Sequence, residues 1–242
     1  FLELFDFHMH FTQLPLYKEL APLLENSKYF AVSSACFSNE WNQLEKLTRE
    51  HRFIQAAYGI HPSEASAFYE SHWKLCLDFI LRNPQSKIGE TGLDKRVPFY
   101  KGNDFQEKLF VLQAKAALQF KRDLIIHCVG DYTRIFKLLR SLGYPQKESN
   151  IVLHRFYPKK HLLQDTLNLD CQLSLHKDSF RSPDLALFLK EIPQEKFKVE
   201  TDADINFVSP NSRPEEIALK LKNEIHETNQ LFLAALESFQ RL

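Results

Sequence analysis

The sequence DFHMH at residues 6–10 directly follows the apolar run LELF, and together they have the character of a β-strand. Residues i and i+2 of a strand point to the same side, so His8 and His10 leave one face of the predicted strand together. Two imidazoles in this position are either core histidines or a pair of metal ligands. The pattern in the rest of the chain helps to distinguish these interpretations.

Seven more short runs rich in β-branched or aromatic residues follow this first strand. Between them, residues 39–51, 131–143 and 182–193 have the apolar spacing of amphipathic helices. Strands that alternate with helices form parallel sheets. Eight such units in 242 residues predict an α/β fold, the TIM (β/α)8 barrel, as a single domain over residues 1–242. The predicted strands are residues 3–9, 29–36, 53–60, 86–92, 123–129, 150–156, 171–177 and 196–202.

Charge and composition exclude several classes of protein. The chain has 31 Lys and Arg and 31 Asp and Glu residues, so no overall positive charge favours nucleic acid, although a local basic patch remains open. A hydrophobic content of 44% is typical of a globular protein rather than a disordered one. No apolar stretch reaches the roughly 18 residues of a membrane span, so we expect no membrane association.

The four cysteines are far apart and form no CxxC pair, which predicts neither a disulfide framework nor a zinc ribbon. Cys128 follows His127, and alternation along the strand is expected to point it away into the core. The start lacks the basic segment of a signal peptide. Because the sequence begins without Met, we expect a few N-terminal residues to be missing. These features together favour the cytoplasm.

Polar residues of metal-ligand type stand at or just after the ends of six predicted strands. Active sites of TIM barrels lie at this rim, where strands end and the next loops begin. Imidazole with carboxylate suits cations such as Zn²⁺ and Mn²⁺, whereas carboxylates with retained waters suit Mg²⁺. The set is large enough for two ions that share a bridging carboxylate, an arrangement that in-line attack on phosphorus can exploit. Its members are His8, His10, His61, Glu90, His127, His154 and Asp202.

A structural role is the alternative for several polar residues at the strand ends. His61 precedes Pro62 in a turn-like context, where a structural role and a substrate contact are equally open. Asp6, Glu90 and Asp202 can also be interpreted as helix N-caps, positions that favour Asp. This interpretation is weakest for Glu90, because it lies inside IGETG rather than before a helical pattern.

The motifs resemble those of a known family when they are taken in order. DFHMH, GIHP, IGETGLD, IIHC, VLHRF and VETDAD are similar to the motifs of the TatD family of metal-dependent deoxyribonucleases, which belong to the amidohydrolase-like barrel superfamily. The resemblance extends from the first predicted strand to the last. HxH or ETD alone is a weak signal, but the ordered set is specific.

The resemblance implies a role for each of these residues. The implied metal ligands are His8, His10 and Asp202 for one cation, His127 and His154 for a second, and Glu90 bridging both. His61 would contact the substrate phosphate or order the site. Because a cation can lower the pKa of a bound water to about 7, Asp202 would orient the attacking water and accept its proton.

The sequence departs from the family pattern around these implied ligands. Val129 stands where the family usually has Arg after the strand-5 histidine, and Tyr157 with Pro158 replaces a small turn. Asp204 replaces a proline after ETDA. Since Arg binds phosphate through two parallel hydrogen bonds, we expect another cationic side chain to supply this contact. The substrate-binding candidates are Arg155 and Arg213, with Lys95, Arg96 and Lys159 elsewhere on the rim.

The sequence therefore predicts a TatD-like hydrolase that cleaves phosphodiester bonds in DNA, either single-stranded or at an end. It would use two divalent cations (Mg²⁺, Mn²⁺ or Zn²⁺), with Asp202 and Glu90 as catalytic residues. One alternative is a metal-dependent hydrolase of a small amide, lactone or phosphoester, which the zero net charge and altered rim would suit. A second alternative is a weakly active metal-binding protein that serves a partner. The oligomeric state stays open.

Overall fold

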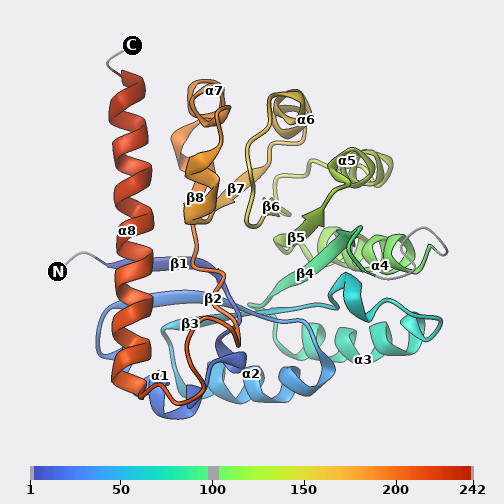
Figure 1. The fold of residues 1–242 in the computed structure, drawn as a ribbon. Coiled ribbons are helices and arrows are strands. Elements are labelled where there is room, and N and C mark those ends of the chain that lie inside the picture. Colours follow the sequence, from blue (N-terminus) through green and yellow to red (C-terminus); the bar gives the residue numbers. More distant parts are fainter. Residues whose placement is uncertain (1–2, 98–103, 241–242) are drawn as a thin grey trace.

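Eight parallel strands form the centre of the structure (Figure 1). The computed structural model describes residues 3–97 and 104–240. The strands pair with their neighbours in sequence order, which confirms the predicted α/β fold of the TIM-barrel type. They are β1 (Leu4–Met9), β2 (Tyr29–Ala35), β3 (Ile54–Tyr58), β4 (Lys87–Asp94), β5 (Leu124–Val129), β6 (Ile151–Leu153), β7 (Gln172–Leu175) and β8 (Phe197–Val199).

Two backbone hydrogen bonds join the segment after β8 to the end of β1. The amide of Asp202 donates to the carbonyl of His8 at 2.9 Å, and the amide of His10 donates to the carbonyl of Ala203 at 2.8 Å. These bonds bring two motifs from opposite ends of the chain, DFHMH and VETDAD, side by side. The side chains of His8, His10 and Asp202 can therefore share one site.

Helices lie outside the strands and connect them (Figure 1). The helices predicted at residues 39–51, 131–143 and 182–193 are confirmed as α2, α5 and α7. None of the helices in the described ranges has both the length and the apolar character needed to cross a membrane. The helices are α1 (Tyr17–Glu25), α2 (Ser38–Glu50), α3 (Tyr69–Arg82), α4 (Phe105–Phe120), α5 (Tyr132–Ser141), α6 (Leu163–Asn168), α7 (Leu185–Glu191) and α8 (Pro214–Gln240).

A small apolar cluster, separate from the main core, shares a face of the sheet with two of the predicted ligands. Side chains alternate along a strand, so His127 lies on the same face as Ile125, and His154 on the same face as Val152. The histidines therefore project from the side that carries this buried cluster, at the carboxyl ends of β5 and β6. The cluster consists of Val32, Ala57, Ile125 and Val152.

A glycine allows β4 to approach β5 just before Glu90. A Cβ atom on Gly89 would lie 2.4 Å from the carbonyl oxygen of Ile125, which is too close for any other residue. The φ of Gly89, +138°, is also one that L side chains rarely adopt. The close approach places the Glu90 carboxylate beside His127, two residues beyond Ile125.

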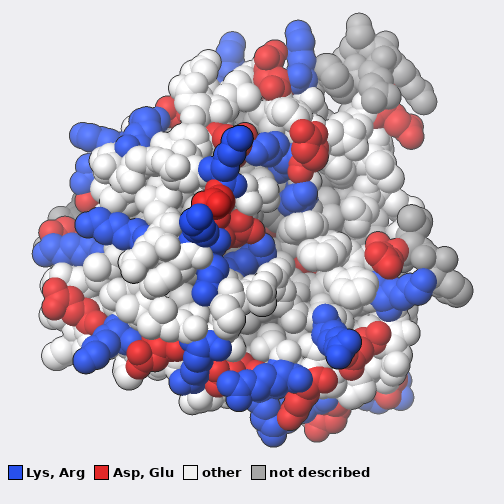
Figure 2. Space-filling view, turned by 180° about the vertical axis from the view of Figure 1, so that it is seen from behind, with Lys and Arg blue, Asp and Glu red and all other residues white. Residues whose placement is uncertain are grey.

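Charged residues of both signs are mixed on the surface seen in Figure 2. This agrees with the equal totals of basic and acidic residues, 31 of each. On this face, no broad region of one sign is present to attract a polyanion. Attraction for a charged substrate there must come from individual side chains at a site.

Candidate active site

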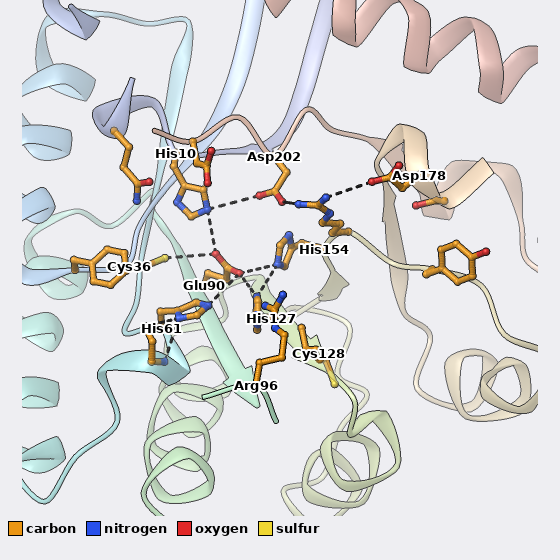
Figure 3. A pocket seen from close by; sticks show the side chains of 18 residues that line it. His10, Cys36, His61, Glu90, Arg96, His127, Cys128, His154, Asp178 and Asp202 are labelled. Carbon is orange, nitrogen blue, oxygen red and sulfur yellow. Dashed lines mark hydrogen bonds and ion pairs between the residues drawn. The ribbon is translucent and has the colours of Figure 1, made fainter. Parts of the chain in front are cut away.

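A cavity of about 600 Å³ opens at the carboxyl ends of the strands (Figure 3). His8 lies beneath it, with no exposed surface, and contacts the carboxylates of Glu90 and Asp202. The structure thus brings to one place the seven ligand-type residues named from the sequence. The other six line the cavity wall: His10, His61, Glu90, His127, His154 and Asp202.

Glu90 lies at the centre of this cluster and is almost fully buried. Its Oε2 atom faces the first pair of histidines, 3.3 Å from Nε2 of His10 and 3.5 Å from Nε2 of His8. Its Oε1 atom faces the second pair, 2.6 Å from Nδ1 of His127 and 2.7 Å from Nε2 of His154. One carboxylate therefore connects two separate pairs of imidazoles.

Asp202 faces the first histidine pair from the opposite side. Its Oδ1 atom is 3.6 Å from Nε2 of His8 and 3.7 Å from Nε2 of His10. Its Oδ2 atom accepts a hydrogen bond of 2.6 Å from Nη1 of Arg155, whose Nη2 also contacts Asp178 at 3.3 Å. Asp202 thus lies between a histidine pair and a half-exposed guanidinium.

The donor set fits divalent cations. Nε2 of His8 is buried without a hydrogen-bond partner among the described residues, although it faces oxygens of two carboxylates. A buried polar atom without a partner is costly unless something binds it. Two groups of three ligand atoms lie within 4.8 Å of one another and share Glu90. These groups are His8, His10 and Glu90, and Glu90, His127 and His154.

The electrostatics of the cluster keep its carboxylates ionised. Burial raises the pKa of Glu90, but the charges of His154 and His127 outweigh it and hold that pKa well below its usual range. Burial lowers the pKa of His10, but hydrogen bonding to Glu90 and the negative charges of Glu90 and Asp202 together outweigh burial and raise that pKa to about 9. Ionised carboxylates are the form that binds metal, and bound cations would take the place of the protons on the histidines.

His61 is a neutral member of the cluster. Burial lowers its pKa to about 4. Its Nδ1 atom accepts a hydrogen bond from the amide of Ser63 at 3.1 Å, so the ring proton lies on Nε2. Nε2 lies 4.0 Å from Oε1 of Glu90, on the cavity side of the ring. His61 therefore offers a neutral hydrogen-bond donor to the cavity.

Asp94 is a functional candidate that the sequence did not reveal. Its Oδ2 atom lies 3.1 Å from Nε2 of His127, and its carboxylate also accepts hydrogen bonds from the guanidinium of Arg96. A carboxylate on one ring nitrogen selects the tautomer and turns the other nitrogen toward the site. The only sequence signal for this role is the position of Asp94 at the end of IGETGLD.

Three residues that can be interpreted as N-caps do not lie at the N-caps of the described helices. Glu90 and Asp202 belong to the cavity. Asp6 is fully buried and accepts hydrogen bonds of 2.6 Å from both the Tyr29 hydroxyl and the Thr201 hydroxyl. It also accepts one of 3.0 Å from the Thr201 amide. Asp6 therefore joins β1, β2 and the segment after β8.

Two cysteines and Arg155 border the cavity, whereas Arg213 does not. Cys128 packs against the main core, as alternation predicted, although the residue also borders the cavity. Cys36 is buried and lies with Sγ 3.7 Å from Oε2 of Glu90. Arg155 lines the cavity, whereas Arg213 is not among its residues and instead pairs with Glu216 at 2.9 Å.

Comparisons with known proteins show the family to which the chain belongs. The model of the TatD related DNase family matches residues 5–227. The chain is 27% identical over 167 residues to the 3'-5' ssDNA/RNA exonuclease TatD of Escherichia fergusonii, covering 68% of this chain and 63% of that protein. It is 25% identical over 208 residues to the protein of the same name from Citrobacter koseri, covering 83% of this chain and 78% of that protein.

A solved structure shows the same fold. The TatD homologue YjjV of Escherichia coli has a TM-score of 0.70 at 20% identity, with 98% of this chain and 96% of that one covered. The chain spans 63% of the length of the first of the curated relatives above. Because the family match extends from the first strand into the last helix, the chain belongs to the TatD-related DNase family.

Proposed function

We propose that this chain is a divalent-metal-dependent hydrolase of phosphodiester bonds in DNA, acting as one domain over residues 1–242. The observation that carries the proposal is the position of Glu90, whose two oxygens each face a different pair of histidines. Membership of a DNase family and the names of relatives as exonucleases of single-stranded DNA support the choice of substrate. The cysteine pattern supports a cytoplasmic location.

We propose that the donor set holds two cations. The substrate would be a single strand of DNA or the end of a DNA strand. Mg²⁺, Mn²⁺ and Zn²⁺ all suit this mixture of imidazole and carboxylate. When bound, such cations polarise the phosphate and make a water more acidic. The residues that would hold them are His8, His10 and Asp202 for one, His127 and His154 for the other, and Glu90 for both.

The remaining steps belong to the side chains of the cavity. His61 would donate a hydrogen bond from its Nε2–H group to a non-bridging phosphate oxygen, because its Nδ1 atom already accepts a hydrogen bond from the Ser63 amide. Arg155 would bind a second phosphate oxygen through its half-exposed guanidinium. Asp202, ionised and held by Arg155, would orient the attacking water and accept its proton.

The proposal is tested with a 5'-labelled single-stranded oligonucleotide and the purified protein. We expect shortening of the strand with Mg²⁺ or Mn²⁺ and none with EDTA. Glu90→Ala and Asp202→Ala should both abolish cleavage, whereas Asp104→Ala, which removes an exposed carboxylate paired with Lys108, should not. Turnover of small esters or lactones without cleavage of DNA would overturn the proposal, as would metal binding without any turnover.

A further inference from the structure

Two aromatic side chains at the mouth of the cavity have no part in the proposed chemistry. We propose that Phe37 and Tyr157 are the base-stacking residues that hold the two nucleotides on either side of the scissile phosphodiester. Both line the cavity, and the Tyr157 side chain is 38% exposed. This inference rests on the proposed function, because it assumes that the phosphate occupies the cluster around Glu90.

The two rings belong to opposite sides of the barrel. Phe37 follows β2 and Tyr157 follows β6, and these strands are four apart in an order of eight. In a closed barrel, strands four positions apart face each other across the mouth. The Glu90 cluster lies between them, because Glu90 lies on β4 and Asp202 follows β8. A nucleotide chain that crosses the cluster would thus pass one ring before the phosphate and the other after it.

The backbone around Tyr157 is fixed on both sides, so the ring is held in place at the mouth. The carbonyl of Phe156 accepts a hydrogen bond of 2.7 Å from Ser179, and the carbonyl of Pro158 accepts one of 2.5 Å from Ser182. Among the described residues, the Tyr157 hydroxyl has no hydrogen-bond partner. A pinned loop that presents an exposed ring with an unused hydroxyl is suited to receive a ligand.

Phe156, the neighbour of Tyr157, explains why this loop does not collapse into the cavity. Its ring is fully buried, with its centroid 5.5 Å from those of Tyr132 and Phe188. Its amide donates to the carbonyl of Ser174 at 3.0 Å. Phe156 therefore anchors the loop in the core and leaves Tyr157 outside it.

Phe37 is positioned in a similar way. Its amide donates to Oε2 of Glu40 at 3.2 Å, and the same oxygen accepts from the amide of Cys36 at 3.0 Å. The ring centroid of Phe37 lies 6.3 Å from that of His61, with the planes tilted by 36°. A base on Phe37 would therefore bring its own phosphate close to the Nε2 proton of His61.

Stacking on these rings would explain how the site holds the bases of a strand, which contacts to the phosphate alone do not explain. Every base has a π-face, so aromatic platforms bind single strands with little preference for sequence. Each ring also needs a base face that no neighbouring base covers, and such faces are readily available in single strands. We therefore expect recognition of bases by their faces, with weak dependence on base identity.

The first experiment compares oligonucleotides with and without a base at one side of the scissile bond. We expect Tyr157→Ala and Phe37→Ala each to raise KM for a normal single strand about tenfold, within the range for loss of one stacking contact. Each variant should match wild type on the substrate that lacks the base its ring would hold. Tyr157→Phe should restore the normal KM, and Phe68→Ala, an exposed ring outside the cavity lining, serves as the control.

The second experiment needs no turnover and separates this inference from the proposed function. A cleavage-resistant phosphorothioate strand with one 2-aminopurine is bound to each protein, since stacking quenches the fluorescence of this base. We expect quenching with wild type and Tyr157→Phe, and its loss with Tyr157→Ala. Quenching that survives Tyr157→Ala overturns the inference. So does an equal rise in KM on normal and abasic substrates, because that result indicates a general disturbance of the loop.

Discussion

The Asp94→Asn substitution tests how the site orients His127. The pKa of Asp94 is held low because hydrogen bonds from His127 and Arg96 outweigh its burial, so the substitution removes a full negative charge. The Asp94 carboxylate faces Nε2 of His127 at 3.1 Å, which leaves Nδ1 free toward Oε1 of Glu90 at 2.6 Å. The amide of Asn has nearly the same shape, but it can present either a donor or an acceptor to the ring. The tautomer of His127 is then no longer selected.

The size of the effect follows from comparable metal sites. Loss of a carboxylate behind a ligating histidine typically lowers metal affinity by about 10- to 100-fold. This corresponds to about 1.4 to 2.8 kcal/mol of binding free energy, at about 1.4 kcal/mol for each factor of ten. We expect Asp94→Asn to lie in this range for Mn²⁺. His127→Ala, which removes the ligand itself, should cost more.

Titration calorimetry with Mn²⁺, together with the electron paramagnetic resonance signal of free Mn²⁺, measures this affinity directly. Thermal unfolding followed by circular dichroism verifies that each variant is folded. Asp104→Asn is the matched control, because its carboxylate is exposed and pairs with Lys108 outside the cavity lining. Unchanged Mn²⁺ affinity in a folded Asp94→Asn protein would refute the role of Asp94, and equal losses in both variants would show a non-specific effect of charge.

Three further predictions follow from the same contacts. EDTA should lower the melting temperature measured by calorimetry, because it removes bound cations, and cations at 100 times their Kd stabilise the folded state by about 2.7 kcal/mol. The Glu90→Ala variant should show little of this shift. Arg155→Ala should slow DNA cleavage by about 10- to 100-fold through loss of charge-assisted hydrogen bonds, whereas Arg213→Ala, outside the cavity lining, should change it by less than about twofold. Burial raises the pKa of Asp123, but the charge of Lys87 and the hydrogen bonds from Lys87 and Asn150 together outweigh it and lower that pKa. The stabilisation is therefore fully present above the unfolded pKa of about 4 and is lost as pH falls below it through the lowered pKa of the folded state, so Asp123→Asn should destabilise the protein more in urea at neutral pH than in acid.

Local sequence was sufficient to predict the strands and the rim where the polar residues gather. DFHMH and VLHRF each place a histidine at the end of an apolar run, and the carboxyl ends of parallel strands meet at one edge. Alternation also predicts which residues share a face, as His127 does with Ile125. The roles assigned to the ligands stay predictions.

These local sequence patterns do not predict which residues of neighbouring strands contact each other. Asp94 meets His127 because β4 and β5 pair with Gly92 opposite His127, and a single sequence does not contain this register. Alternation correctly places Cys128 against the main core, but it does not show that the same residue also borders the open mouth of the cavity. Arg213 was named from its charge alone, and the path of the preceding loop instead places it at the start of α8.

The same hydrogen bonds hold the barrel together and set the spacing of the ligands. Asp6 lies two residues before His8, and its carboxylate binds Thr201, the residue before Asp202. A buried carboxylate is stable only when its hydrogen-bonding capacity is filled, and the Tyr29 hydroxyl contributes a further bond. Because Asp6 ties together segments from the two ends of the chain, we expect a loss of its hydrogen-bond partners to shift His8 relative to Asp202. Asp6 therefore contributes to both fold and site, together with the backbone hydrogen bonds between the end of β1 and the segment after β8.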